Sequence, residues 1–376
     1  MPVYLDCNAT APLEPAVRET MLTYFDVEYG NAGSRTHEFG LRAKRAVQEA
    51  REAVAVVVRA QPEEIYFTSG ATESNNLAIL GLAPHGEATK RKHIISTALE
   101  HKAVLEPLEH LEKHGFEITL IAPNSDGVVR PELIEAALRP ETLLVSIMHA
   151  NNETGTIQPL DQVSEILREH SAYFHVDAAQ GFGKELSLLR SDRIDLISIS
   201  GHKIYGPKGI GALVARRRGI ERIPLKSIMF GGGQERGLRP GTLPVPLIVG
   251  LGKAAEAALK DNAKRTSRNM QIRTAALDAL GSLNIEINGD QTRSLVSTLN
   301  FSVPGVDAEA AMVALKNIAA ISNGSACTSS SYEPSHVLTA MVLPEWRVQG
   351  AIRLSWCHMT DDVNWSAIVS ALRRLQ

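Results

Sequence analysis

The sequence predicts an α/β protein with a large, mostly parallel seven-stranded sheet and a smaller α+β unit at the C-terminus. The first observation is a series of short apolar runs at 65–68, 93–97, 117–122, 142–148, 172–176, 195–200 and 211–215. Most are uninterrupted, as strands covered on both faces are. The second is the helical pattern between them, because strand–helix–strand repetition favours a doubly wound parallel sheet. The third is that the alternation of apolar runs and helical patterns stops after residue 240, where a long helical stretch and then short mixed elements follow.

The helices follow in chain order. Small apolar residues from Ala43 to Val57 recur at i, i+3, i+4 and i+7, which predicts an amphipathic helix packed on the sheet. Further helical patterns cover 131–138 and 159–170, and a long one over 247–280 predicts a connector.

The C-terminal part mixes short strands and helices. Its expected strands are 284–288, 297–303, 318–322 and 352–356, with a helix near 307–315. A final helix is expected to begin at a Thr360 cap, with Asp361 and Asp362 in its first turn. We expect a large domain over 15–255 and a small domain formed by 1–14 and 256–376, which includes a Gly/Ser/Thr-rich loop at 322–334.

Composition excludes several classes of protein. The 376 residues include 39 basic and 42 acidic ones, a formal net charge of −3, which argues against direct nucleic-acid binding through bulk charge. No run approaches the roughly 20 apolar residues of a membrane span, and the N-terminus has no signal-peptide pattern. The three cysteines, Cys7, Cys327 and Cys357, fit neither a disulfide framework nor a zinc site, so no metal is expected. A cytoplasmic enzyme is the prediction.

Three segments carry chemistry at the carboxyl ends of predicted strands. The turn at 68–72 leads into a helix and suits a phosphate, although, taken alone, a plain capped turn is the more common explanation. Asp177 follows the strand at 172–176, where it is either a ligand or a turn residue. Lys203 follows the strand at 195–200, where partial desolvation would favour a neutral amine; Lys208 reads as a solvated surface charge. A Schiff-base lysine, a carboxylate and a phosphate cradle are together what pyridoxal 5'-phosphate requires.

The chain resembles the class V, fold-type-I enzymes that depend on pyridoxal phosphate, and among them the NifS/IscS-like cysteine desulfurases. The resemblance covers almost the whole chain through the motifs YLDCNATAPL (4–13), TSGATESNNLAI (68–79), EHKAVL (100–105), SIMHANNETG (146–155), HVDAAQ (175–180), SGHKIYGPKGIGAL (200–213), GGGQERGLRPGTLPV (231–245), SNGSACTSSSYEPS (322–335) and AIRLSW (351–356).

The resemblance implies a role for each matching residue. Lys203 would be the Schiff-base lysine, Asp177 the partner of the pyridine nitrogen, and Gln180 the partner of the ring hydroxyl. His101 would stack on the ring and, as a catalytic residue beside Lys203 and Cys327, help with proton transfers. Other residues would surround the cofactor phosphate: Ala71, Thr72, Ser200 and His202. Thr242 would reach the phosphate of the other subunit, which implies a homodimer with shared active sites. Asn152 would lie near both the cofactor ring and the substrate, and Arg353 would bind the substrate carboxylate through two hydrogen bonds. Asn31 would lie at the mouth of the same pocket and contact the substrate.

Cys327 decides which reaction the resemblance implies. It lies in a polar loop without a neighbouring basic residue, so its thiolate needs a base in the pocket or the substrate thiol. The expected reaction converts L-cysteine to L-alanine, leaves a persulfide on Cys327 and passes the sulfur to an acceptor protein. The pathway could be iron–sulfur cluster assembly, tRNA thiolation or DNA phosphorothioation.

Other readings stay open. Selenocysteine lyase or another class V reaction is the nearest alternative, and a non-catalytic sulfur-transfer scaffold is a more distant one. The sequence ends at Gln376, directly after the last expected helix, whereas housekeeping members continue with a tail that docks the iron–sulfur scaffold protein. The sequence therefore argues against that scaffold protein as the partner, and it does not choose among the other sulfur acceptors.

Overall fold

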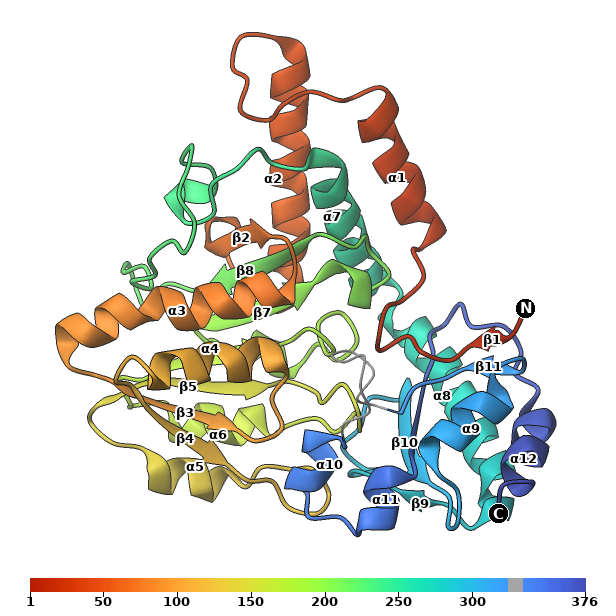
Figure 1. Ribbon diagram of the computed structural model, residues 1–376. Coiled ribbons are helices and arrows are strands. Elements are labelled where there is room, and N and C mark those ends of the chain that lie inside the picture. The colour runs from red at the N-terminus through yellow and green to blue at the C-terminus, as the bar shows by residue number, and fades with distance from the viewer. Residues whose placement is uncertain (324–333) are drawn as a thin grey trace.

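A computed structural model describes residues 1–323 and 334–376, and its largest element is the predicted seven-stranded sheet (Figure 1). Its strands lie in the order β2-β8-β7-β6-β5-β3-β4. Their bounds are β2 Ile65–Thr68, β3 His93–Thr97, β4 Glu117–Ile121, β5 Thr142–Met148, β6 Tyr173–Asp177, β7 Leu196–Ser200 and β8 Gly211–Ala215. The seven predicted runs are confirmed, with ends that agree to within one residue.

The sheet is parallel except at β8, which runs antiparallel to both β2 and β7. Only residues 201–210 join β7 to β8, which is shorter than the dozen or more residues that a parallel crossover needs. Since β8 turns back, its first residue, Gly211, pairs with Ser200 and with Thr68. The carboxyl ends of β2 and β7 therefore lie at the same edge of the sheet.

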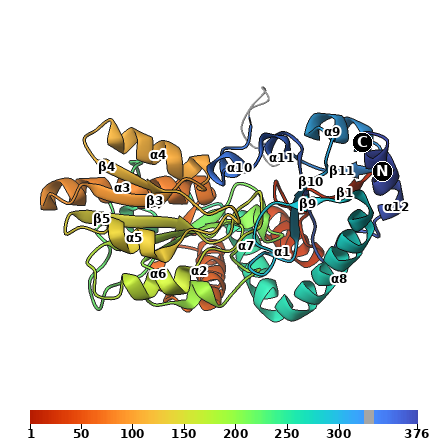
Figure 2. The same cartoon turned by 90° about the horizontal axis from the view of Figure 1, so that it is seen from below.

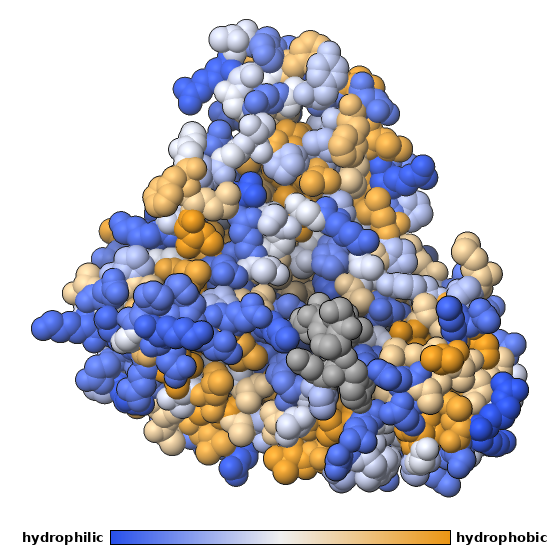
Figure 3. All heavy atoms as spheres, in the orientation of Figure 1, coloured by the Kyte–Doolittle hydropathy of each residue, from blue (hydrophilic) through white to orange (hydrophobic). Residues whose placement is uncertain are grey.

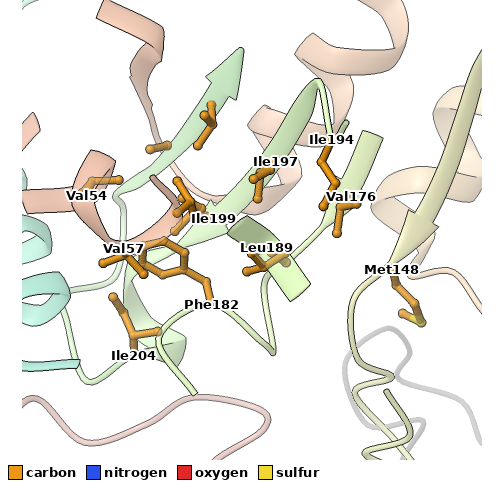
Figure 4. Close-up of a cluster of buried hydrophobic side chains, with 14 of the residues drawn as sticks. Val54, Val57, Met148, Val176, Phe182, Leu189, Ile194, Ile197, Ile199 and Ile204 are labelled. Atoms are coloured by element: carbon orange, nitrogen blue, oxygen red, sulfur yellow. The ribbon is translucent and has the colours of Figure 1, made fainter. Parts of the chain in front are cut away.

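Helices cover both faces of the sheet (Figures 1 and 2). On one face, α2 (Glu38–Val58), α5 (Pro131–Ala137), α6 (Leu160–Ile166) and α7 (Val245–Lys260) contribute to the largest core cluster, and α1 (Pro15–Asp26) packs on α7. Figure 4 shows part of this cluster, where Val54 and Val57 of α2 lie near strand residues such as Ile197 and Ile199. On the other face, α3 (Ala71–Thr89) and α4 (Lys102–Glu112) form a second cluster. Burial on both faces explains why these strands lack apolar–polar alternation.

The C-terminal part has its own core around two small sheets. One is the antiparallel sheet β12-β10-β9, and the other pairs β1 with β11 in parallel. Its elements are β1 Val3–Tyr4, α8 Asn262–Leu280, β9 Glu286–Ile287, β10 Thr298–Ser302, α9 Ala308–Leu315, β11 Ala319–Ala320, α10 His336–Ala340, α11 Glu345–Gln349, β12 Ala351–Ser355 and α12 Trp365–Arg373. Short 3-10 turns lie at Pro62–Glu64, Leu188–Arg190, Gly201–Lys203, Glu235–Gly237 and Gly281–Leu283. The division into domains at 14/15 and 255/256 stays a prediction.

Two helix predictions need correction. The long helical stretch at 247–280 is two helices, α7 and α8, that break at Asp261. The final helix, α12, does not begin at Thr360: Asn364 is its N-cap and accepts from the Ala367 N–H at 3.1 Å. The Thr360 hydroxyl instead accepts from the Cys357 N–H at 2.9 Å, so it stabilises the turn after β12, and Asp361 and Asp362 lie before the helix. A threonine cannot serve both turns at once.

Among the residues that the structure describes, no helix combines the length and the apolar character that a membrane span requires.

Candidate active site

A cavity of about 550 Å³ lies at the carboxyl edge of the large sheet. It collects residues that follow β2, β6 and β7, and its wall includes Met148 at the end of β5. The cavity-lining residues that the sequence predicted are Ala71, Thr72, His101, Asn152, Asp177, Gln180, Ser200, His202 and Lys203. The predicted convergence of the segments at 68–72, 177 and 203 is therefore confirmed as geometry.

Lys203 points its ammonium group at the N-terminal segment. It lies in the 3-10 turn directly after β7, and its Nζ donates to the Ala9 carbonyl at 2.7 Å and to the Asn8 carbonyl. Both acceptors are backbone oxygens of residues that also line the cavity. Sequence reasoning missed Asn8 and Ala9 as site residues, although they lie within the motif YLDCNATAPL. Lys208 is exposed, as predicted, yet it also lines the cavity.

The Asp177 carboxylate is held by one donor on each oxygen. The Asn75 amide donates to Oδ2 at 2.7 Å, and the Ala179 N–H donates to Oδ1 at 2.9 Å. Asp177 is 5% exposed, so its orientation depends on these two bonds. Asn75 was missed; the signal was a pair of asparagines in a helix that was otherwise expected to pack against the sheet.

The turn at 69–72 leaves backbone groups open to the cavity. Gly70 is the N-cap of α3 with φ +154°, a conformation that a residue with a side chain rarely adopts. A Cβ on Gly211 would lie 2.6 Å from the Gly70 Cα, so the start of β8 can approach the turn only as glycine. Glu73 turns away from the cavity wall to accept from the Ser69 N–H at 2.7 Å and from Arg239 at 2.8 Å. The turn with its helix start suits an anionic group.

Two histidines present neutral rings to the cavity. His101 is the N-cap of α4, and its Nδ1 accepts from the Ala103 N–H at 3.1 Å. Burial lowers the pKa of His101; the charge of Asp177 opposes this shift and that of Lys203 adds to it. Burial, together with the Lys203 charge, lowers the pKa of His202 to about 4, and its Nδ1 lies 3.1 Å from the Thr10 hydroxyl.

Arg353 lies behind the cavity wall and is fully buried. It comes from β12, and its Nη1 donates to the Asn152 carbonyl at 3.0 Å. Its Nη2 donates to the Asp6 carboxylate at 2.7 Å. Asp6, which the sequence analysis did not predict as a site residue, thus holds the Arg353 guanidinium in place. The neighbour of this guanidinium, Asn152, lines the cavity.

Two further predicted site residues that the structure describes, Asn31 and Thr242, do not line the cavity of this chain. Asn31 is exposed between α1 and α2, where its side chain accepts from the Gly33 N–H at 2.8 Å. Thr242 is exposed before α7. Cys327 lies outside the residues that the structure describes. The roles of all three stay predictions.

Comparison with known proteins places this site in a family. The class-V aminotransferase model matches residues 3–364. The chain belongs to the class-V aminotransferase family. "Cysteine desulfurase IscS" of Rickettsia bellii is 47% identical over 96% of this chain and 88% of the relative, and that of Vibrio campbellii is 44% identical over 99% and 92%.

Solved structures agree with this assignment. The crystal structure of DndA from Streptomyces lividans is 52% identical, with a TM-score of 0.83 over 92% of this chain and 97% of that one. A NifS-like protein is 36% identical, with a TM-score of 0.89 over 100% and 98%. The predicted fold class and the predicted cysteine desulfurase family are confirmed, and with them the dependence of this enzyme on pyridoxal phosphate.

The residues present fit that cofactor. The cavity holds one lysine that reaches inward, one fixed carboxylate and a glycine-containing helix start, each from a different part of the sheet edge. These groups match the aldehyde, the ring nitrogen and the phosphate of pyridoxal phosphate.

Proposed function

We propose that this enzyme converts L-cysteine to L-alanine and transfers the sulfur through Cys327 to an acceptor protein. The observation that carries the proposal is the convergence of Lys203, Asp177 and the turn at 69–72 on one cavity. Its support from relatives is the shared name cysteine desulfurase over nearly the whole chain.

Each cavity residue has a proposed task toward the cofactor. Lys203 holds the cofactor aldehyde, Asp177 keeps a proton on the ring nitrogen, and His101 covers the ring. The phosphate is held by the 71–72 helix start with Ser200 and His202. We propose that His202 serves the phosphate as a hydrogen-bond donor through a protonated ring nitrogen.

The substrate is placed by Asn152, which lines the cavity, and by Arg353, which lies directly behind Asn152. We propose that Arg353 and Asn152 receive the carboxylate of L-cysteine and that Asn31 lies near the entrance. Two of the five guanidinium donors of Arg353 are used by Asn152 and Asp6, so further donors remain for a carboxylate.

The proposed reaction balances without an added oxidant or reductant. When bound, the cofactor withdraws electrons from the substrate Cα, while Lys203 removes and returns a proton at that carbon. The Cys327 thiolate attacks the substrate sulfur, so that the carbon–sulfur bond breaks and a sulfur–sulfur bond forms. The bonding pair stays on the substrate Cβ, which takes up one proton to replace the one lost from the Cys327 thiol, and L-alanine leaves. An acceptor thiol then takes the sulfur from Cys327.

The test replaces Cys327 by Ser. We expect C327S to bind pyridoxal phosphate with the same visible absorbance as the wild type, yet to lose at least 100-fold in formation of L-alanine and sulfide, on the order of what loss of a nucleophile costs. Lys203→Ala serves as the control, because it should lose both the absorbance and the activity. Undiminished turnover of C327S with a thiol acceptor would refute the role of Cys327.

The substrate class is tested separately. Assays with L-cysteine, L-selenocysteine and a 2-oxo acid distinguish a desulfurase from a selenocysteine lyase or an aminotransferase. A protein that binds an acceptor but turns over none of these would be a scaffold. A similar structure, SspA, was solved in complex with cysteine, and its chain is 37% identical to this one, which favours L-cysteine.

We further propose a cytoplasmic homodimer with shared active sites. Large apolar side chains are exposed over α1, the α1–α2 loop, α2 and residues 228–230, and Figure 3 shows hydrophobic residues over α1 and α2. These side chains are Leu22, Phe25, Val27, Tyr29, Phe39, Leu41, Val56, Ile228, Met229 and Phe230. A second copy of this chain would cover them. Thr242 is exposed on its own chain, which suits a residue that serves the partner subunit.

A further inference from the structure

A second lysine lies directly behind the cavity. Lys184 follows β6 by one short turn, and its Nζ donates to the Gln180 Oε1 at 3.3 Å. Gln180 lines the cavity, and its Nε2 donates to the Asn8 carbonyl at 2.9 Å. Lys203 donates to the same Asn8 carbonyl. Two lysines are thus joined through one glutamine and one backbone oxygen.

This arrangement fixes the orientation of the Gln180 amide. A lysine ammonium only donates, so the amide oxygen has to face Lys184. A backbone carbonyl only accepts, so the amide nitrogen has to face Asn8 and the cavity. If Lys184 were apolar, the amide oxygen of Gln180 would lose this donor, and the Asn8 carbonyl alone would orient the amide.

We propose that Lys184 is a positioning residue for the cofactor: it holds the Gln180 amide with its N–H groups toward the ring oxygen, and it places a second positive charge close to Lys203. The inference rests on the proposed function, since it assigns a role toward the same cofactor. Lys184 does not line the cavity and therefore acts through its neighbours.

The charges around Lys184 make its own protonation sensitive to the site. The positive charge of Lys203 lowers the pKa of Lys184. Cys7 of the N-terminal segment and Cys357, just after β12, act in the opposite direction and raise it. Burial and the Lys203 charge lower the pKa of Lys184 to about 8.

A smaller cavity of about 160 Å³ lies on the other side of Lys184. Two further charged side chains line it, Glu185 and Arg265. Glu185 lies 3.3 Å from the His149 Nε2, and Arg265 pairs with Glu14. Glu185 also accepts from the Ser187 hydroxyl at 2.6 Å, and Arg265 is itself a donor, whereas the Gln180 Oε1 accepts from the Lys184 ammonium.

The experiment compares the holoenzymes of wild type, K184R and K184M. The measurements are the pH titration of the visible cofactor absorbance and the dissociation constant of pyridoxal phosphate. A nearby positive charge disfavours a proton on the nitrogen that links Lys203 to the cofactor. K184M should therefore raise the pKa of the absorbance change by roughly half to one pH unit, and K184R should leave it unchanged. K184Q replaces K184M if the latter folds poorly, with the same expected shift.

A double variant tests whether Lys184 acts through Gln180. If it does, Q180A/K184M should bind the cofactor no more weakly than Q180A alone. If the wild type binds the cofactor and is coloured, but K184M shows the same absorbance pKa and the same cofactor affinity, then only the role of Lys184 is overturned. A wild type that stays colourless with pyridoxal phosphate overturns the proposed function itself.

Discussion

Glu100, the residue before His101, is a carboxyl group buried without a cation. It is 0% exposed; its Oε1 accepts from the Met148 N–H at 2.9 Å and from the Thr97 hydroxyl at 2.8 Å. Within the described residues, its Oε2 has no hydrogen-bond partner. Burial raises the pKa of Glu100 to about 8, so the side chain is neutral beside the site at neutral pH.

A pH-dependent loss of stability follows from Glu100. Its pKa is higher in the folded chain than in the unfolded chain, so the folded state holds the extra proton. Stability should fall as pH rises from about 4.5 to about 8, by at most about 1.4 kcal/mol per pH unit. Glu100→Gln should remove this fall. In urea titrations, the free energy of unfolding of E100Q relative to that of the wild type should therefore be higher at pH 8 than at pH 6.

An exposed carboxylate on α4 provides the control. Glu106→Gln should change the stability equally at both pH values, since Glu106 is exposed. If E100Q shows the same difference from the wild type at pH 6 and at pH 8, Glu100 does not carry the extra proton in the folded chain.

Elements were predictable where their signal is local. Six of the seven strands of the large sheet could be read from apolar runs because they are buried on both faces. The edge strand β4 was also predicted from its run, although only Ile121 of its five residues is buried. The start of α12 was not predictable, because Thr360 and Asn364 are both good caps and only the turn after β12 decides between them.

The site was predictable where a residue ends a strand, as Asp177 and Lys203 do. The contacts that hold these residues were not, because they join distant parts of the chain. Asn75 meets Asp177 across 102 residues, and Asp6 meets Arg353 across 347. The residue pattern of a single segment cannot predict contacts of this kind.

The packing of α7 on α2 depends on one glycine. A Cβ on Gly252 would lie 2.6 Å from both the Cα and the Cβ of Ala50, so the two helices would have to separate. Gly252→Ala should therefore destabilise the protein by about 1–3 kcal/mol, although alanine favours a helix. Thermal unfolding measures this loss.

The matched substitution is Gly281→Ala at the end of α8. Its backbone has φ −54° and ψ −26°, and no heavy atom lies within 4 Å of the added Cβ. We expect G281A to be neutral or to stabilise by about 0.4–1 kcal/mol. If G252A were as stable as G281A, α2 and α7 would not pack as closely at Gly252 and Ala50 as the structure shows.

At the scale of the whole molecule, the N-terminal segment connects the two ends of the chain to the cavity. Val3 and Tyr4 pair with β11, and Asp6 bridges to Ser355 at the end of β12. Asn8 then reaches the cavity, where its side chain donates to the Asn152 carbonyl at 3.0 Å. The first eight residues therefore join the C-terminal sheets to the edge of the large sheet where Lys203 lies.

The proposed dimer makes its own prediction at this scale. If Thr242 serves the partner subunit, each active site combines Lys203 of one chain with Thr242 of the other. Lys203→Ala and Thr242→Val homodimers should both be impaired. In a mixed dimer of the two variants, one site holds both lesions and the other holds none. Random reassociation should then recover roughly a quarter of the wild-type activity, because half of the dimers are mixed and each has one intact site. If Thr242 serves its own chain, no mixed site is intact, and mixing should recover nothing beyond the sum of the two separate preparations.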